Sequence, residues 1–317
     1  MTASQIETIL TGDPITAGEI LRRGGIVAFP TETVYGLGAN VFDEQAIARV
    51  FEAKQRPQDN PLIAHIGDVG QLERLAVNIT DFARVLIDEF FPGPLTLVLK
   101  KAATVPHIAT AGLDSIGIRM PRHELARAFL AACGTPVVAP SANLSGRPSP
   151  TTWEAVFEDL DGRIDCILQG DPTEIGLEST VVDCTGDRPV VLRQGSVTLD
   201  EIRKVVPNAA ANDSADDARK SPGLRHKHYS PNSTVMIVDR TTKIIDAPSA
   251  AYIGQSDRDE RFAAEQIVSD ADEYARILFE FFRECEREGL KTIYCEAVEE
   301  TGIGAALMDR IRRAAQG

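Results

Sequence analysis

The chain has 317 residues, of which 43% are hydrophobic and 25% charged, a composition typical of a soluble globular protein. No apolar run approaches the roughly eighteen residues that cross a bilayer, and the first residues do not resemble a signal peptide, so we expect a cytoplasmic protein without a membrane partner. The formal net charge is −14, and acidic residues outnumber basic ones by 27 to 18 over residues 1–207 and by 20 to 15 over residues 208–317, so strong direct binding of nucleic acid, which needs many basic contacts to phosphate, is not expected.

Helical and strand-like patterns alternate over the first two thirds of the chain. Short apolar runs predict buried strands over residues 26–29, 62–66, 95–99, 116–120, 137–139, 165–168, 179–183 and 190–193. Apolar residues at helical spacing predict helices over residues 15–23, 43–53, 79–90 and 124–132, the second of them capped by Asp43. This alternation indicates an α/β domain over residues 1–207, with a twisted, mixed, open sheet flanked by helices.

A second unit begins after Pro231. Strands are expected over residues 235–238, 251–253 and 292–295, and helices over residues 271–287 and 304–315. This order predicts a small Rossmann-like α/β domain over residues 234–317, joined to the first domain by a connecting segment, residues 208–233.

The connecting segment changes character along its length. Residues 209–218 are mostly Ala, Asn, Asp and Ser, as in a linker, whereas residues 221–231 read SPGLRHKHYSP. The prolines and glycine disfavour regular structure there, and the basic and aromatic side chains between them suit an anionic ligand. Two interpretations are open: a strap over an anionic ligand, or an exposed linker that happens to be basic. His226 and His228 likewise fit either a metal pair or solvent-facing side chains.

Familiar catalytic templates are absent from the sequence. There is no phosphate loop, no Gly-x-Ser-x-Gly elbow and no His-Glu-x-x-His pair, and the five cysteines include no Cys-x-x-Cys, so neither a zinc site nor a disulfide framework is expected. Instead, dense polar segments follow the predicted strands. Ligands of open α/β sheets bind beyond the strand ends, so these loops are the expected place for a site.

Single side chains in these loops each allow two interpretations. Lys54 and Arg56 fit the solvated end of a helix or a pair of anion ligands held in place by nearby prolines. Arg119 lies in an apolar run, where a charge is costly unless paired with a protein carboxylate, such as Glu32 or Glu178, or with the carboxylate of a ligand. A local turn role and a ligand contact are both open for Ser141, Asn143 and Ser145.

Taken in order, these segments resemble the threonylcarbamoyl-adenylate synthase family in its long form, with a YrdC-like catalytic domain and a C-terminal domain. The matching segments are PTETVYGLG (residues 30–38), KQRPQDNPL (54–62), PGPLT (92–96), GIRMP (117–121), PSANLSG (140–146), ESTVVD (178–183) and RQG (193–195). Two more, residues 221–231 and GIGAALMDR (302–310), match the long form specifically.

The resemblance implies a nucleotidyltransferase of tRNA processing, which forms threonylcarbamoyl-AMP and pyrophosphate from L-threonine, bicarbonate or CO2, and ATP. Because a carbamate of threonine can attack the α-phosphate itself, positioning and charge neutralisation supply the catalysis and no protein nucleophile is required. Mg²⁺ is implied as the companion of ATP, with no tightly bound organic cofactor and no dedicated metal site. The product is expected to pass to a tRNA threonylcarbamoyl-transferase complex, which modifies adenosine next to the anticodon.

The resemblance also implies roles for individual residues. The implied catalytic residues are Lys54, Arg56 and Arg119. The implied threonine pocket comprises Thr31, Thr33, Tyr35, His65, Arg119, Ala139 and Ser179. The implied ATP ligands are Lys54, Arg56, Asn60, Ser115, Ser141, Ser149, Arg193 and Tyr229. Tyr229 of the strap is expected to close over the ATP side and to shield the reactive mixed anhydride from water.

Two other functions compete with this one. A carbamoyl-adenylate-forming enzyme of the hydrogenase-maturation type keeps the fold, but such proteins carry acylphosphatase-like and zinc-finger segments that this chain lacks. A non-catalytic RNA-binding module is disfavoured by the net charge of −14, and a steep salt dependence of RNA binding would reveal it.

Overall fold

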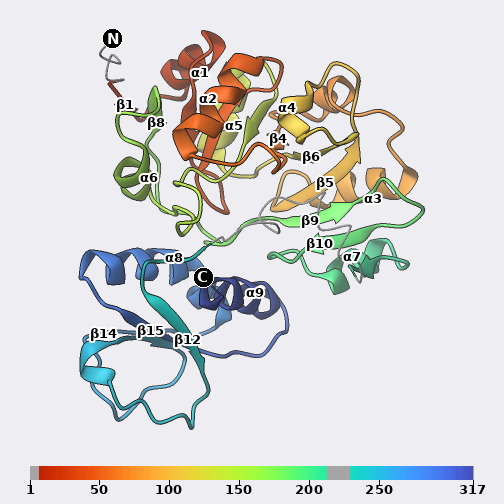
Figure 1. Cartoon of the computed structure of the whole chain (residues 1–317). Coiled ribbons are helices and arrows are strands. Elements are labelled where there is room, and N and C mark those ends of the chain that lie inside the picture. Colours follow the sequence, from red (N-terminus) through yellow and green to blue (C-terminus); the bar gives the residue numbers. More distant parts are fainter. Residues whose placement is uncertain (1–6, 213–228, 317) are drawn as a thin grey trace.

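The computed structural model describes residues 7–212 and 229–316 and contains two α/β domains (Figure 1). The larger domain is built on one sheet with the strand order β1-β8-β2-β3-β7-β4-β6-β5-β9-β10-β11. Parallel pairs such as β4 with β6 and antiparallel pairs such as β4 with β7 occur side by side, which confirms the predicted mixed sheet. The strands are β1 (Ile9–Thr11), β2 (Val27–Phe29), β3 (Gly36–Asn40), β4 (Ile63–His65), β5 (Leu95–Lys100), β6 (Ser115–Arg119), β7 (Val137–Ala139), β8 (Cys166–Leu168), β9 (Thr180–Asp183), β10 (Val190–Arg193) and β11 (Ala210–Ala211).

Helices of the larger domain follow the predicted positions within a few residues. Asp43 caps α2 by accepting hydrogen bonds from the backbone N–H groups of Gln45 and Ala46, as its position predicted. Four of the helices, η1, α4, α6 and α7, were not predicted. The helices are α1 (Pro14–Arg22), α2 (Glu44–Lys54), η1 (Val69–Arg74), α3 (Asp81–Phe90), α4 (His107–Thr110), α5 (Glu124–Cys133), α6 (Trp153–Leu160) and α7 (Leu199–Val205).

Strand β3 was not predicted, because its first residues belong to the PTETVYGLG segment (residues 30–38), which was expected to be a loop. Two of its five residues are glycines, which weaken strands in isolation. The sheet explains them. A Cβ atom at Gly38 would lie 2.7 Å from the side chain of Val137, so only glycine allows β3 to lie against its neighbours at this position. The close approach brings the start of β3 next to the loop after β7, where Gly36 and Ser141 form an isolated bridge.

The smaller domain has a fully parallel sheet in the order β12-β15-β13-β14, which confirms the Rossmann-like prediction. Its strands are β12 (Thr234–Val238), β13 (Ala251–Gly254), β14 (Ala264–Ile267) and β15 (Thr292–Glu296), and its helices are α8 (Ala271–Arg287), α9 (Ile303–Ala315) and the short η3 (Ala247–Ser249). Both α8 and α9 pack together on the face of this sheet that is turned toward the larger domain (Figure 1). Arginines from the two helices therefore reach the larger domain.

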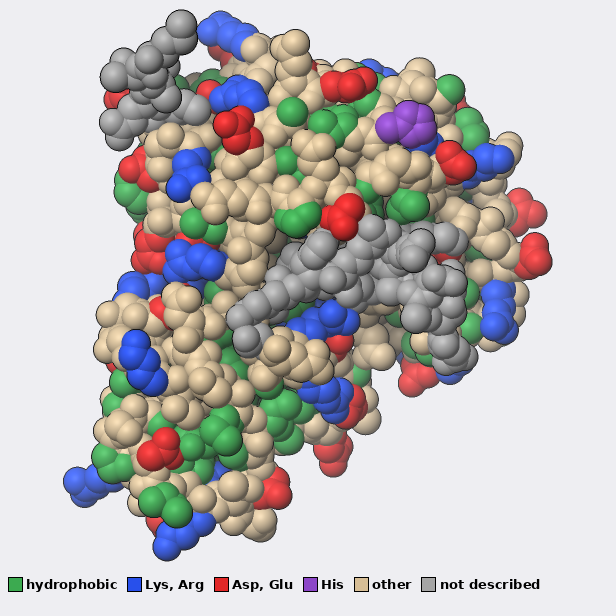
Figure 2. Space-filling model, in the orientation of Figure 1, with side chains coloured by type: hydrophobic (Ala, Val, Ile, Leu, Met, Phe, Trp, Pro, Cys, Tyr) green, Lys and Arg blue, Asp and Glu red, His purple; other side chains and the backbone are tan. Residues whose placement is uncertain are grey.

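Within the described ranges, no helix combines the length and apolar character needed to cross a membrane. Figure 2 shows basic and acidic side chains interspersed over the visible face. Residues 213–228 of the predicted connecting segment, His226 and His228 included, lie outside the described residues.

Candidate active site

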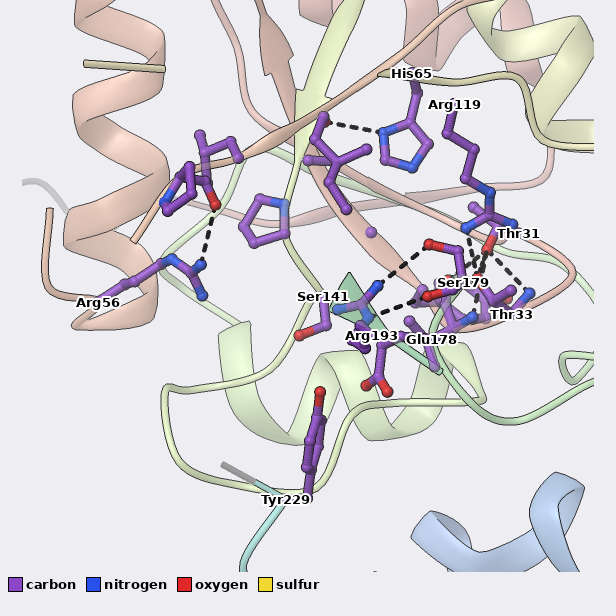
Figure 3. Close-up of a pocket in the computed structure, with 18 residues that line it drawn as sticks. Thr31, Thr33, Arg56, His65, Arg119, Ser141, Glu178, Ser179, Arg193 and Tyr229 are labelled. Atoms are coloured by element: carbon purple, nitrogen blue, oxygen red, sulfur yellow. Dashed lines mark hydrogen bonds between the residues drawn. The ribbon is translucent and has the colours of Figure 1, made fainter. Parts of the chain in front are cut away.

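A cavity with an empty volume of about 600 Å³ opens among the strand ends of the large sheet. Most of the predicted site residues line it (Figure 3). They are Thr31, Thr33, Tyr35, Arg56, His65, Arg119, Ala139, Ser141, Ser179, Arg193 and Tyr229. The structure thus brings together residues from loops that are up to about 200 positions apart in the sequence.

Arg119 is held at the end of β6 by a buried carboxylate. Its Nη2 lies 2.8 Å from Oε1 of Glu32, its Nη1 donates to Oγ1 of Thr33 at 2.7 Å, and its Nε donates to the carbonyl of Gly93 at 3.3 Å. Of the two partners left open by the sequence, Glu32 is therefore the one that pairs with Arg119. Burial alone would raise the pKa of Glu32, but the adjacent Arg119 holds that pKa below its ordinary value, so the pair is ionised.

Small polar side chains surround this guanidinium. The hydroxyls of Thr31 and Thr33 are 2.8 Å apart, and Thr31 donates to the carbonyl of Val34 at 2.7 Å. The hydroxyl of Ser179 lies 2.8 Å from that of Thr96, on the neighbouring strand β5. The hydroxyls of Thr31, Thr33 and Ser179 make the cavity wall near Arg119 polar.

His65 lies beside Arg119 because β4 and β6 are parallel and place the two residues in register. Its Nδ1 donates to the carbonyl of Ile63 at 3.2 Å, and its ring meets Phe29 edge to face. Burial, with a further contribution from the positive Arg119, lowers the pKa of His65 to about 3. The imidazole is therefore neutral at pH 7 and adds no positive charge to the pocket.

Two more buried guanidinium groups reach the cavity. Arg56, just beyond α2, is 8% exposed, and its Nη2 donates to the carbonyl of Pro61 at 3.4 Å. Burial lowers the pKa of Arg56 to about 10, which leaves it charged at pH 7. Arg193, at the end of β10, donates from Nε to the carbonyl of Ser179 at 3.0 Å and from Nη2 to its hydroxyl at 3.2 Å. Buried positive charge of this kind favours an anionic ligand.

Lys54, predicted to hold phosphate, does not line the cavity. Its Nζ donates to the backbone carbonyls of Ser141, at 2.5 Å, and of Asn143, while its own carbonyl accepts from the N–H of Ser145 at 2.9 Å. Lys54 is 1% exposed, and burial lowers its pKa well below the ordinary value. In this geometry it anchors the loop over residues 140–146, which carries Ser141 to the cavity wall.

The other predicted residues vary in position. The hydroxyl of Tyr35 donates to the carbonyl of Gly170 at 2.9 Å, so only the body of this side chain serves the cavity. Ser115 begins β6, and a rise of about 3.3 Å per residue places it about 13 Å from Arg119 at the other end. Asn60, Ser115 and Ser149 are buried but do not line the cavity.

Two residues that shape the cavity, Glu178 and Arg310, were not among the predicted site residues. Glu178 lines it and was considered only as a partner of Arg119, but it pairs instead with Arg310 of α9, whose Nε lies 2.9 Å from Oε2. Ser149 donates to Oε1 of Glu178 at 2.6 Å. The sequence signal for Arg310 was its place in the GIGAALMDR segment, which matches the long form of the family. Its position in a predicted helix of the second domain gave no reason to expect contact with the first domain.

The described residues provide no resident metal site of the usual kind. Within residues 7–212 and 229–316, no group of three or more His, Cys, Asp and Glu side chains is arranged as metal ligands.

Fold and cavity together define a two-domain enzyme with a YrdC-like catalytic domain. A family model of Sua5, YciO and YrdC proteins, described as "Telomere recombination", matches residues 19–195, and the model "Threonylcarbamoyl-AMP synthase, C-terminal domain" matches residues 197–316. The chain is 45% identical to threonylcarbamoyl-AMP synthase of Pyrococcus abyssi, covering 95% of this chain and 93% of the relative, and 40% identical to that of Bacillus subtilis, covering 98% and 96%.

A solved structure agrees over the whole length. The crystal structure of P. abyssi Sua5 complexed with L-threonine matches with a TM-score of 0.90 at 41% sequence identity, covering 98% of this chain and 97% of that one. The chain therefore belongs to the threonylcarbamoyl-AMP synthase family, and the predictions of family, fold class and enzyme class are confirmed.

Proposed function

We propose that the protein forms threonylcarbamoyl-AMP and pyrophosphate from L-threonine, bicarbonate or CO2, and ATP. The observation that carries this proposal is one buried cavity with two different anion-binding regions. Arg119 and Thr33 lie on one side of the view in Figure 3, Arg56 lies on the other, and Arg193 lies between them. This arrangement offers one set of partners for an amino-acid carboxylate and another for a polyphosphate.

The Arg119 side suits L-threonine. Its guanidinium is oriented by Glu32, so it is already fixed for a carboxylate, and the hydroxyls of Thr33 and Ser179 lie within the same pocket. A cluster of hydroxyls also discriminates in favour of a substrate with a hydroxyl, because an apolar side chain would leave buried polar groups unpaired.

The Arg56 side suits the triphosphate of MgATP. In the proposed reaction the amine nitrogen of threonine adds to CO2 and loses a proton, and a carbamate oxygen then attacks the α-phosphorus. The bond from the α-phosphorus to the bridging oxygen breaks, and pyrophosphate leaves. The residues Arg56 and Arg193 would neutralise the phosphate charge, which is the main requirement of such a transfer. Mg²⁺ enters as part of the nucleotide substrate.

The product is a mixed anhydride that water destroys, so a closed site is an advantage. Tyr229, 4% exposed, lies at the cavity wall and would restrict the access of water there. We infer that the product passes to a tRNA threonylcarbamoyl-transferase complex in the cytoplasm, where it serves the modification of adenosine next to the anticodon.

The proposal is tested by pyrophosphate release from ATP and bicarbonate, with and without L-threonine. We expect release to require threonine and Arg119→Ala to lower kcat/KM for threonine by about 10- to 100-fold, the effect of losing charged hydrogen bonds. Arg122→Ala is the matched control, since Arg122 follows on the same segment but pairs with Glu174 at the surface.

Release that ignores threonine would contradict the proposal. The alternatives would then be tested directly. Pyrophosphate release that depends on carbamoyl phosphate would indicate a carbamoyl-adenylate-forming enzyme. RNA binding that weakens steeply with increasing salt concentration would indicate an RNA-binding module.

A further inference from the structure

One arginine of the small domain reaches the wall of the catalytic cavity. Arg310 on α9 is fully buried and donates from Nε to Oε2 of Glu178 at 2.9 Å. Its Nη1 donates to Oδ2 of Asp309 at 2.8 Å, and its Nη2 donates to the carbonyl of Gln194 at 3.1 Å. The guanidinium is therefore fixed on three sides, and two of its partners belong to the catalytic domain.

The same guanidinium contacts a second residue of the cavity wall. The Arg310 guanidinium carbon lies 5.4 Å from the centroid of the Tyr229 ring, within the range of a cation–π contact. The same ring also stacks on Phe279 of α8, at 5.4 Å between centroids and 20° between planes. Tyr229 is thus held from two helices of the small domain.

The charge of Glu178 explains why this contact matters for the cavity. Glu178 lines the cavity on the same side as Arg193, and both residues are buried. A carboxylate at this place would repel a polyphosphate and would compete with it for Arg193. Burial by itself would raise the pKa of Glu178, but Arg310 and then Arg193 hold that pKa below its ordinary value, so the carboxylate is charged. If Arg193 is to remain available for phosphate, another arginine must neutralise the Glu178 carboxylate.

We propose that Arg310 is a positioning residue for the nucleotide. By pairing with Glu178 it prevents this carboxylate from drawing Arg193 away from the phosphates, and by contact with Tyr229 it shapes the adjoining wall. The small domain thereby acts on nucleotide affinity across the domain interface. This inference rests on the proposed function, which supplies the nucleotide.

A purely structural role is the competing explanation. Other arginine pairs also join the domains: Arg283 with Asp159, Arg147 with Glu286, and Arg287 with Glu158. Removal of Arg310 alone therefore leaves the domains joined. If Arg310 were only one more tether, removing the Glu178 charge would not compensate for its loss.

The test measures binding of a non-hydrolysable ATP analogue, α,β-methylene-ATP with Mg²⁺, by isothermal titration calorimetry. The variants are Arg310→Met, Glu178→Gln and the double variant, with Arg287→Met as the interdomain control. We expect Arg310→Met to weaken analogue binding by about tenfold or more, the effect of one charged hydrogen bond to phosphate. We expect the double variant to bind within about threefold of wild type, and L-threonine affinity in Arg310→Met to change by less than about threefold.

The inference would be overturned by wild-type affinity in Arg310→Met, by no recovery in the double variant, or by an equal loss of threonine affinity. If circular dichroism shows that Arg310→Met does not fold, Arg310→Lys is measured in its place, and we expect it to bind the analogue like wild type because an ammonium group still neutralises Glu178. A folded Arg310→Lys whose affinity for the analogue is tenfold weaker would also overturn the inference. A wild-type protein that does not bind the analogue would instead contradict the proposed function.

Discussion

The interface between the two domains contains a buried ion pair whose removal should be costly. Arg283 on α8 and Asp159 on α6 have side chains 1% and 0% exposed. The guanidinium donates to both carboxylate oxygens, at 3.2 and 3.0 Å, and Nη2 also donates to the carbonyl of Pro148 at 2.6 Å. In Arg283→Met the apolar stem is replaced at similar size, but all three hydrogen bonds are lost.

The expected loss follows from what remains around Asp159. Breaking a buried pair by removing one partner costs about 3 to 5 kcal/mol. Asp159 keeps Arg147 and the N–H of Leu144, at 3.0 Å, so its charge is still partly neutralised. We therefore expect the lower end, a decrease of about 3 kcal/mol in the free energy of unfolding, with a fall in Tm of about 6 °C or more.

Urea unfolding followed by circular dichroism, together with calorimetry to separate the two domains, measures this decrease. The matched control is Arg287→Met, also on α8. Arg287 pairs with Glu158 at 3.1 Å across the same interface but is 45% exposed, so the expected change is below about 1 kcal/mol. Equal effects of the two variants, or a loss below about 1 kcal/mol in Arg283→Met, would show that burial does not determine how much an ion pair of this interface contributes to the free energy of unfolding.

Two further predictions concern the cavity wall. In Lys54→Met the carbonyls of Ser141 and Asn143 lose their buried donor, so we expect a decrease of about 2 to 3 kcal/mol in the free energy of unfolding and weaker binding of the ATP analogue. Urea unfolding measures the first effect and titration calorimetry the second. Little change in Lys54→Met, or the same change in the control Lys101→Met, would contradict the anchoring role of Lys54. Burial lowers the pKa of His65 to about 3, so below about pH 6.5 the unfolded chain binds a proton that the folded protein does not, and stability should fall with decreasing pH by up to about 1.4 kcal/mol per unit. Urea midpoints between pH 7 and pH 4 should decline less in His65→Gln than in wild type, and parallel declines would refute the assignment.

Local patterns in the sequence were enough to predict the elements with strong periodicity. Helix α8 spans Ala271–Arg287, the same bounds as the predicted helix, because a long amphipathic stretch behind the N-cap Asp270 favours no other structure. Edge strand β14 was missed for the opposite reason: its residues Ala264–Ile267 alternate between partly buried and exposed, and two of the four are polar.

The site could be predicted as a set of loops but not as a geometry. Glu32 was a possible partner of Arg119, but only the sheet register and the loop after β2 bring the two side chains to 2.8 Å. The direction of Lys54 depends on where the loop over residues 140–146 lies, and that of Arg310 on how one domain rests on another. Such long-range contacts leave no periodic trace in the sequence, so an arginine at a helix position cannot be distinguished from a surface charge.

The carboxylates near the cavity have one property in common. Glu32 and Glu178 are both buried and are each paired with an arginine, Arg119 from the same domain and Arg310 from the other. Because these pairs neutralise the acidic side chains, the charge of Arg56, whose pKa burial lowers to about 10, is not offset by either of them. A buried guanidinium of this kind costs folding free energy that an anionic substrate offsets on binding. The two interdomain pairs therefore differ in their expected roles: the Arg283 pair stabilises the domain interface, whereas the Arg310 pair neutralises a carboxylate that would otherwise offset the positive charge of the cavity.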